Sequence, residues 1–384
     1  MLGLEHRGFS LEHPQRHIAN FLKQHGYHTV LSGVEHTTSQ PAEVGYHTVL
    51  SNQDTNYPAT ADDPPAAPAA AKFLQNAGEQ PFFLSIGLNE THRPFPSPDP
   101  TRFAYEDERY CVPPRPLPDT PQIRRDFAAF KASARLMDDA YGRVLDALAQ
   151  AQLAENTLVC CFTDHGLQFP RNMCNLTDHG IGVYLVIRGP GGFDGGRGHA
   201  GLVVDELASL IDLFPTVCDV CDLPKPDWLQ GHSLAPVVNE REPLRDEIHA
   251  EINYHASYEP TRCVRTHRHK YIRRFDDRSA LVLPNVDQSP SKTQLLELGW
   301  CQQRREQEML FDLALDPDEA NNLARSADLT DTLTQMRHRL DRWMHDTNDP
   351  LLAGPVPAPR GGRVNDPDQH SPKDPATTIN ARSG

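Results

Sequence analysis

The residues best suited to chemistry follow a short apolar run near the middle of the chain. Residues 158–162 predict a buried strand in a parallel sheet, and Thr163-Asp164-His165-Gly166 comes directly after them. In open α/β sheets, ligands bind beyond the carboxyl ends of the strands. A carboxylate beside an imidazole suits a divalent cation, so Asp164 and His165 are the candidate metal ligands. The structural alternative is an Asp that caps the next turn and a His that bonds locally.

Two further histidines follow other predicted strands. His92 lies in the segment Asn89-Glu90-Thr91-His92-Arg93, after the apolar run at residues 81–88, and His36 comes shortly after a predicted strand at residues 29–31. Histidine can give or take a proton near neutral pH, so both are candidate acid–base groups. Taken singly, each also fits an ordinary surface histidine.

The elements that would position these residues alternate between helix and strand. Apolar residues at three- and four-residue steps predict a long helix at residues 126–153, which leads into the strand at 158–162. Strand-like pieces recur at residues 247–252, 263–275 and 309–315, and an amphipathic helix follows near residues 329–343. We therefore predict an α/β domain over residues 1–240 and a small α+β domain over 246–350. A Pro/Gly-rich tail, predicted to be disordered, occupies 351–384.

Composition limits the class of partner. The 384 residues carry a net charge of −15, which argues against a nucleic-acid backbone or an anionic membrane surface as the main partner. No apolar run approaches the roughly 18 residues of a membrane span. The first residues show no signal-peptide pattern, and the eight cysteines do not resemble a secreted disulfide framework. Oligomeric state has no signal in the sequence.

Three motifs occur in a fixed order: strand then Thr-His-Arg-Pro-Phe, strand then Thr-Asp-His-Gly, and the turn Phe-Asp-Leu-Ala-Leu-Asp-Pro-Asp-Glu. Together they resemble the sulfatase family of the alkaline-phosphatase superfamily, above all its sulfamidase-type members. The resemblance implies an α/β fold with a mixed, largely parallel sheet flanked by helices. It also implies a small C-terminal α+β domain with an antiparallel sheet and a closing helix.

The resemblance also implies roles for particular residues. Asp164 and His165 match two ligands of the single divalent cation of the family, most often Ca²⁺. His36 matches the histidine next to the nucleophile, and His92 matches the one that contacts the sulfate and protonates the leaving group. The expected substrate is a sulfated sugar or other small sulfated molecule. The identity of that sugar, and the choice between O- and N-sulfate, stay open.

The chain departs from the family at the nucleophile. Relatives carry an Asp-Asp pair and a Cys-x-Pro-x-Arg segment, whose Cys becomes formylglycine, before the position of His36; neither precedes His36 here. Cys111-Val112-Pro113-Pro114-Arg115 fits the second pattern literally. We reject Cys111 as the nucleophile, because it follows His92 and lies in a Pro-rich stretch that cannot begin a helix as the family's segment does. The first strand and the nucleophile are therefore expected to be missing, which leaves the compartment open.

Two basic sulfate contacts of the family are also replaced, by Val34 and Met173. Arg171 is a candidate substitute for the second. With three residues of the small domain it could form a substrate rim: Glu251, His255 and Arg262.

Three functions remain as hypotheses. The first is a sulfatase-type hydrolase that is inactive as this chain. The second is a sulfatase-fold remnant or binding protein without chemistry, and the third is a related metal-dependent phospho-hydrolase with a Ser or Thr nucleophile. A sheet without its first strand leaves backbone groups unpaired, so we also expect the isolated chain to be poorly soluble or partly molten.

Overall fold

The computed structural model describes residue 9 and residues 11–38, 40–52, 66–96, 107–193 and 201–379. The α-helices within these ranges are α1 (Ile18–Gln24), α2 (Ala66–Gln75), α3 (Pro121–Gln150), α4 (Asp178–Ile181), α5 (Leu213–Val220), α6 (Ala235–Glu240), α7 (Pro290–Glu297) and α8 (Thr330–Asp346). The strands are β1 (His28–Gly33), β2 (Thr48–Asn52), β3 (Phe82–Gly87), β4 (Val159–Phe162), β5 (Leu185–Arg188), β6 (Glu247–Tyr254), β7 (Tyr258–Thr266), β8 (His269–Arg274), β9 (Glu308–Asp312), β10 (Arg363–Val364) and β11 (Thr377–Thr378). Single 3₁₀ turns include η2 (Glu108–Tyr110), η6 (Leu283–Asn285), η7 (Trp300–Gln302) and η9 (Pro350–Leu352).

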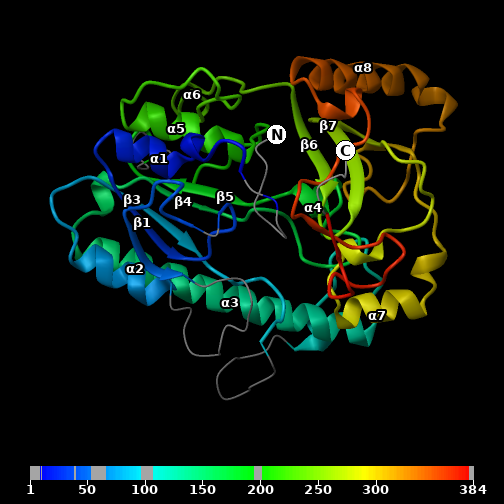
Figure 1. Cartoon of the computed structure of the whole chain (residues 1–384), viewed down its shortest axis with the longest axis horizontal. Helices are drawn as coiled ribbons and strands as arrows, with labels where there is room; N and C mark the ends of the chain where they lie inside the picture. Colours follow the sequence, from blue (N-terminus) through cyan, green and yellow to red (C-terminus); the bar gives the residue numbers. More distant parts are fainter. Residues whose placement is uncertain are drawn as a thin grey trace.

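The chain forms two parts that lie side by side (Figure 1). In the first, strands β1, β3, β4 and β5 lie between α1 and α5 on one side and α2 and α3 on the other. In the second, β6 and β7 lie beside α8. The long helix α3 runs beneath the first part and reaches α7 of the second. The predicted α/β part and small antiparallel part are thus both present.

The central sheet is parallel, in the order β2-β1-β3. Val30 and Leu31 of β1 are completely buried, because helices cover both faces of this strand. Leu31 packs with Ala19 of α1, whereas Ser32 donates a hydrogen bond of 2.7 Å to Ala66 O of α2. A strand buried on both faces is typical of a parallel sheet between helices.

Strand β4 differs from its prediction. It pairs only with β5, and the pairing is antiparallel, so the expectation of a parallel partner for residues 158–162 is wrong within the described residues. Phe82 and Leu84 of β3 nevertheless share one apolar cluster with Val159 of β4, on helices α2 and α3. The two sheets therefore rest on the same helices without a hydrogen-bonded ladder between them among the residues described. The predicted poor solubility rests on such unpaired edges and stays a prediction.

Helix α3 begins five residues earlier than predicted. The side chain of Thr120 accepts a hydrogen bond of 3.3 Å from Ile123 N, and Pro121 occupies the first helical position. Both features favour a helix start. The Thr120 side chain accepts from a backbone N–H that has no partner within the helix, and proline has no backbone N–H that would need one. None of the described helices is long and apolar enough to cross a bilayer.

The second part is a four-stranded antiparallel sheet in the order β6-β7-β8-β9. Helix α8 covers one face of it through Leu333, Met336, Leu340 and Met344, which pack on Val264 and Tyr271. The predicted strands and the amphipathic closing helix are therefore present. Their period-two and period-3.6 patterns identify the buried faces correctly.

Residues 351–379 differ from the disordered tail expected. They fold back on the second part: Asn365 is 1% exposed and donates from its backbone N to Ala256 O at 2.8 Å. The ammonium of Lys292 on α7 donates to His370 O at 2.6 Å. The prediction assumed that a segment with few apolar residues cannot be held, whereas polar and backbone hydrogen bonds hold this one.

His249 of β6 lies flat against Trp343 of α8, with ring centroids 4.7 Å apart. Burial lowers the pKa of His249 from 6.5 to about 4, although Glu247, 3.7 Å away, acts in the opposite direction. Three arginines also face the imidazole and lower its pKa further: Arg342, Arg245 and Arg339. The folded chain therefore favours the neutral imidazole.

Acid is expected to destabilise the second part through His249. Between pH 6.5 and about 4 the unfolded chain binds more protons at this residue, so the free energy of unfolding falls as the pH falls through that window. The loss should reach roughly 2–3 kcal/mol. His249→Phe keeps the stacking and should flatten this dependence, whereas His338→Gln on the exposed side of α8 should not. Urea unfolding at pH 7 and pH 4.5, followed by Trp343 fluorescence, measures it; an unchanged acid loss in His249→Phe would contradict it.

Candidate active site

The loops that carry His36 and His92 leave the same edge of the central sheet. Strands β1 and β3 run in register, with Gly33 opposite Gly87 at their ends. A Cβ at Gly33 would lie 2.1 Å from Gly87 O, and one at Gly87 would lie 2.0 Å from Val34 O. Gly33 also has a φ of +99°, which disfavours any other residue. Glycine at both positions lets the two backbones leave the sheet in close contact.

Beside His36, the carboxylate of Glu35 organises the loop. It accepts hydrogen bonds from Thr37 N at 2.8 Å and from the Tyr46 hydroxyl at 3.1 Å. Burial and this nearby carboxylate raise the pKa of Tyr46, so the phenol stays protonated as the donor. His36 itself is exposed, as a residue that meets a substrate must be.

The imidazole of His92 has a defined tautomer. Its Nδ1 lies 2.6 Å from Arg93 O, and its backbone N donates to Asn89 O at 2.7 Å. Because a carbonyl oxygen can only accept, Nδ1 carries a hydrogen. The second nitrogen, Nε2, is then the atom that takes up or delivers a proton, and the side chain is exposed. This arrangement suits the acid role expected of His92.

Glu90, two residues before His92, was not singled out from the sequence. Burial raises the pKa of its carboxyl, and its Oε2 is buried without a hydrogen-bond partner among the described residues. A carboxyl that holds its proton more firmly than usual, two residues from the candidate acid His92, is a second candidate proton donor. The sequence gives no signal for this, because burial of a loop residue depends on the tertiary fold.

Arg93 joins the His92 loop to the segment after β4. Its backbone N donates to Gln168 Oε1 at 2.6 Å, and its Nε donates to Gln168 O at 3.2 Å. The guanidinium forms two hydrogen bonds of 2.7 Å to Asp126 of α3. The two loops therefore touch through Arg93 and Gln168. His92 precedes Arg93 by one residue, and Asp164 precedes Gln168 by four.

Asp164 and His165 face solvent at the end of β4, with side chains 84% and 41% exposed. His165 Nδ1 lies 2.8 Å from Gly166 O, so Nδ1 carries the hydrogen, and the basic Nε2 lies 4.0 Å from Asp164 Oδ1. A basic imidazole nitrogen near a carboxylate oxygen is a donor pair that fits two positions of a divalent-cation site. The described residues contain no cluster of three or more His, Cys, Asp or Glu that could complete it.

A second Thr-Asp-His-Gly, at residues 177–180, holds the first one in place. Gly166 N donates to Gly180 O at 2.8 Å, and Leu167 N donates to His179 O at 3.1 Å. A Cβ on Gly166 would lie 2.1 Å from His179 O, so only glycine allows this contact. Our sequence analysis missed this role, although the repeated tetrapeptide was a visible signal.

Gly166→Ala should therefore lower the free energy of unfolding by about 1–3 kcal/mol, because the new methyl group forces the two loops apart. The matched control is Gly142→Ala in α3, where a Cβ meets no atom within 4 Å. That change should stabilise the helix by about 0.5–1 kcal/mol. Urea unfolding of both variants tests the contrast, and equal effects would mean that the loop contact does not matter.

The proposed substrate rim does not form as expected. Arg262 is completely buried and bonds both carboxylate oxygens of Asp349, at 2.9 Å for the Nη2 contact. It lies on the face of the sheet that α8 covers, because Val264, two residues further along β7, packs on α8 and alternate residues of a strand share a face. A rim role for Arg262 is therefore wrong. Glu251 is exposed on β6 and lies 3.4 Å from Arg262, and His255 lies in the turn after β6.

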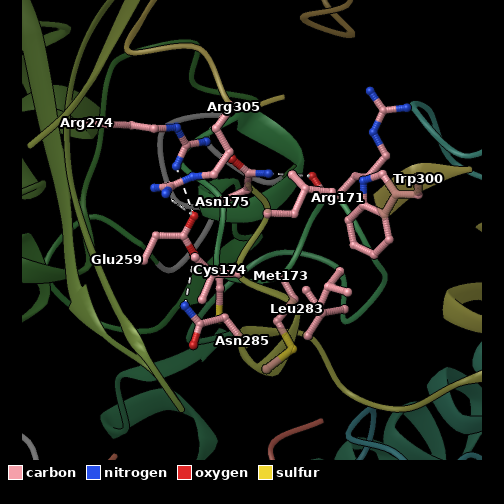
Figure 2. Close-up of a pocket in the computed structure, with 13 residues that line it drawn as sticks. Arg171, Met173, Cys174, Asn175, Glu259, Arg274, Leu283, Asn285, Trp300 and Arg305 are labelled. Atoms are coloured by element: carbon pink, nitrogen blue, oxygen red, sulfur yellow. Dashed lines mark hydrogen bonds and ion pairs between the residues drawn. The ribbon is translucent and has the colours of Figure 1, made fainter. Parts of the chain in front are cut away.

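Arg171 lies elsewhere, on the loop after β4. Its guanidinium donates to Pro116 O at 3.2 Å, and burial lowers its pKa. It lines a pocket together with Glu259, Arg274 and Arg305 (Figure 2). The structure thus groups Arg171 with residues that the sequence did not suggest, rather than with Glu251 or His255.

Cys111 is 1% exposed and follows the turn η2. Its backbone N donates to Glu108 O at 3.2 Å, so it ends a turn rather than beginning a helix. A buried thiol at this place is poorly suited to attack a substrate.

Comparison with known proteins then defines the family. The family model described as Sulfatase matches residues 3–223, more than half of the chain. This chain belongs to the sulfatase family. A second model, described as N-sulphoglucosamine sulphohydrolase, C-terminal, matches residues 165–298. The expected resemblance is confirmed, and it extends into the small domain.

Two curated relatives illustrate the similarity. An ulvan-active sulfatase of Formosa agariphila is 27% identical over 291 residues, which cover 72% of this chain and 48% of that protein. Human N-sulphoglucosamine sulphohydrolase is 29% identical over 336 residues, which cover 74% of this chain and 64% of that protein. The chain thus spans about half to two thirds of the length of these sulfatases.

Solved structures agree on the fold. A protein crystallised with its substrate D-glucosamine-2-N,6-O-disulfate superposes with a TM-score of 0.62 at 16% identity, over 89% of this chain and 84% of that one. A phosphonate monoester hydrolase from Silicibacter pomeroyi gives 0.65 at 18%, over 89% and 82%. The alkaline-phosphatase-like α/β fold of the sulfatase is thereby confirmed.

Proposed function

We propose that this sulfatase chain carries the cation-binding and leaving-group side of an active site for a sulfated sugar. The observation that carries the proposal is the pair of hydrogen bonds between Arg93 and Gln168. They join the loop of His92 to the loop of Asp164 and His165, at the edge where His36 also leaves the sheet. This contact between the two loops supports a site in which an acid–base group and a cation-binding pair act together.

Each residue has a definite task in this proposal. Asp164 and His165 would hold the divalent cation, Ca²⁺ in this proposal, which supplies positive charge to sulfate oxygens when bound. Where an attacking group is supplied to the sulfur, His92 would deliver a proton from Nε2 to the leaving oxygen or nitrogen as its bond to sulfur breaks. His36 lies at the same edge and would take a proton when sulfate is released.

The proposed site does not include the group that attacks sulfur. Sulfatases use a formylglycine made from cysteine, and the first cysteine in this sequence is Cys111, which is buried after His92. We therefore propose that the chain by itself binds the substrate without hydrolysing it. The human relative named for N-sulphoglucosamine, and the neighbour that binds a glucosamine disulfate, support an amino sugar sulfate as the ligand.

Calorimetric titration with glucosamine N-sulfate, with and without Ca²⁺, tests the proposal. Binding should need Ca²⁺, and it should weaken about tenfold or more in His92→Ala and in Asp164→Asn, since each loses a charge-assisted contact. His338→Ala on α8 is the matched control and should bind normally. Absence of Ca²⁺-dependent binding would refute the proposal. So would turnover of p-nitrophenyl sulfate that disappears in Cys111→Ala, because the buried thiol would then be the nucleophile.

A further inference from the structure

The second part of the chain contains a pocket that the proposed reaction does not use. It lies between the loop at residues 171–175, the turns η6 and η7, and the strands β7 and β8, and its empty space of about 400 Å³ is partly open to solvent. We call it the arginine pocket, because Arg171, Arg274 and Arg305 line it together with the single carboxylate of Glu259 (Figure 2). Its enclosed part has room for only a few water-sized groups, which suits a small ion.

Both carboxylate oxygens of Glu259 already have hydrogen-bond or ion-pair partners. Its Oε1 lies 3.0 Å from Arg274 Nη1 and 3.3 Å from Arg305 Nη2, so two guanidinium groups share one oxygen. Its Oε2 accepts a hydrogen bond of 2.9 Å from Asn285. The carboxylate therefore has little capacity left to satisfy further donors.

The arginines retain N–H groups without acceptors. The Nε atoms of Arg274 and Arg305 are both buried and have no hydrogen-bond partner among the described residues. Arg305 has a second carboxylate partner in Asp276 at 3.1 Å, whereas Arg274 pairs with Glu259 alone among the residues that the structure describes. Burial lowers the pKa of Arg274, which marks a guanidinium whose charge is poorly compensated. Buried donors of this kind are costly unless a ligand supplies acceptor oxygens.

The charge of the lining points to the sign of that ligand. Three guanidinium groups and one carboxylate line the pocket, and Asp276 lies just beyond it. Arg171 has no carboxylate partner among the described residues, but its guanidinium donates to Pro116 O and points away from Arg274 and Arg305 in Figure 2. The remaining wall is mixed, with apolar side chains such as Met173 and Leu283 and two amides, Asn175 and Asn285.

We propose that the arginine pocket binds a small oxyanion, a sulfate or a carboxylate group, on Arg274 and Arg305. An oxyanion offers several acceptor oxygens, and guanidinium groups bind such groups with paired, charge-assisted hydrogen bonds. The shared contact to Glu259 shows that the two guanidinium groups already converge on one oxyanion oxygen. The ligand would be free sulfate or the anionic group of a saccharide. This proposal does not depend on the proposed hydrolysis.

The test uses the full chain with His92→Ala, so that binding at the candidate active site does not contribute. Sodium sulfate should raise the melting temperature more than sodium chloride of equal ionic strength, and Arg274→Gln should weaken sulfate binding about tenfold. Glu259→Gln should act in the opposite direction and tighten binding, because it removes the competing carboxylate. Glu306→Gln, at an exposed ion pair with Arg325, is the matched control.

Two results would overturn the proposal: equal effects of sulfate and chloride, or unchanged binding in Arg274→Gln. If Arg274→Gln does not fold, Glu259→Gln decides, and weaker or unchanged sulfate binding in that variant contradicts the proposal. Methyl sulfate, glucosamine 6-sulfate and glucuronate distinguish the sources. Tighter binding of a sugar-linked anion than of free sulfate would identify a saccharide group, and the reverse would identify a site for the free ion.

Discussion

Asp126→Ala is expected to lower the free energy of unfolding by about 3–5 kcal/mol, because it leaves a buried arginine without its counter-charge. The side chains of Arg93 and Asp126 are 9% and 3% exposed, and both carboxylate oxygens accept from the guanidinium at 2.7 Å. Asp126 also accepts hydrogen bonds from the backbone and hydroxyl of Ser291, at the start of α7. One substitution thus releases the His92 loop and the start of α7 together.

The aromatic surroundings of Arg93 limit the loss. Its guanidinium lies 4.0 Å from the ring centre of Phe95 and 4.9 Å from that of Phe169, so some cation–π attraction remains after the substitution. Urea unfolding followed by the fluorescence of Trp300, which belongs to the same apolar cluster as Phe169, reports the effect locally.

The matched control for Asp126→Ala is Asp119→Ala. Asp119 pairs with Arg124 near the start of the same helix, but its side chain is 51% exposed. An exposed ion pair contributes about 0–1 kcal/mol, so the control should change stability little. A loss of less than about 1 kcal/mol in Asp126→Ala would show that the buried pair does not hold the His92 loop.

The contrast between these two aspartates shows where sequence reasoning stopped. The motifs around His36, His92 and Asp164 identified the loops, since short strands, glycines and histidines are local features. Nothing local distinguished Asp126 from Asp119, because the difference is burial, which depends on residues far apart in the chain. Arg262 illustrates the same limit: it looked like a rim residue until β7 placed it against α8.

Strand β4 shows a different limit. Its apolar run correctly predicted a strand, but the predicted parallel pairing was wrong. A run of apolar residues indicates that a strand is buried, and does not indicate which strand it pairs with or in which direction. The tail at residues 351–379 was mispredicted for a related reason: composition reports apolar burial, and this segment is held by hydrogen bonds such as that from Lys292 to His370 O. The grouping of Arg171 with Glu259, Arg274 and Arg305 in the arginine pocket was not predicted, because four separate segments contribute these residues.

The loop of Asp164 also depends on a buried charge cluster between the two parts of the chain. Lys270 of β8 is completely buried, and its ammonium lies 2.9 Å from Glu319 Oε1 and in contact with Asp178 of α4. Glu319 in turn accepts a hydrogen bond from Asp178 N. Asp178 begins the four-residue helix whose His179 and Gly180 carbonyls hold the first Thr-Asp-His-Gly. The small domain therefore positions the candidate cation ligands through Lys270.

The pKa values of the two carboxyls show how much Lys270 matters. Burial raises the pKa of Glu319, and Lys270 opposes that shift. Burial also acts on Asp178, but there Lys270 and Arg265 prevail and lower its pKa. Asp178 keeps Arg265 as a partner if Lys270 is lost, whereas the described residues offer Glu319 no second cation.

Lys270→Met should consequently cost about 3–5 kcal/mol at pH 7, because it leaves the Glu319 carboxylate buried and unpaired while the stem still packs. The deficit should shrink as the pH falls, since protonation of Glu319, whose pKa is raised, removes the buried charge. Lys270→Met/Glu319→Gln should recover much of the loss at pH 7, and Arg325→Met, at an exposed pair, should change little. Urea unfolding monitored by Trp343 fluorescence measures all three. A Lys270→Met deficit that is independent of pH, or is not reduced by Glu319→Gln, would show that packing and not charge joins α4 to the small domain.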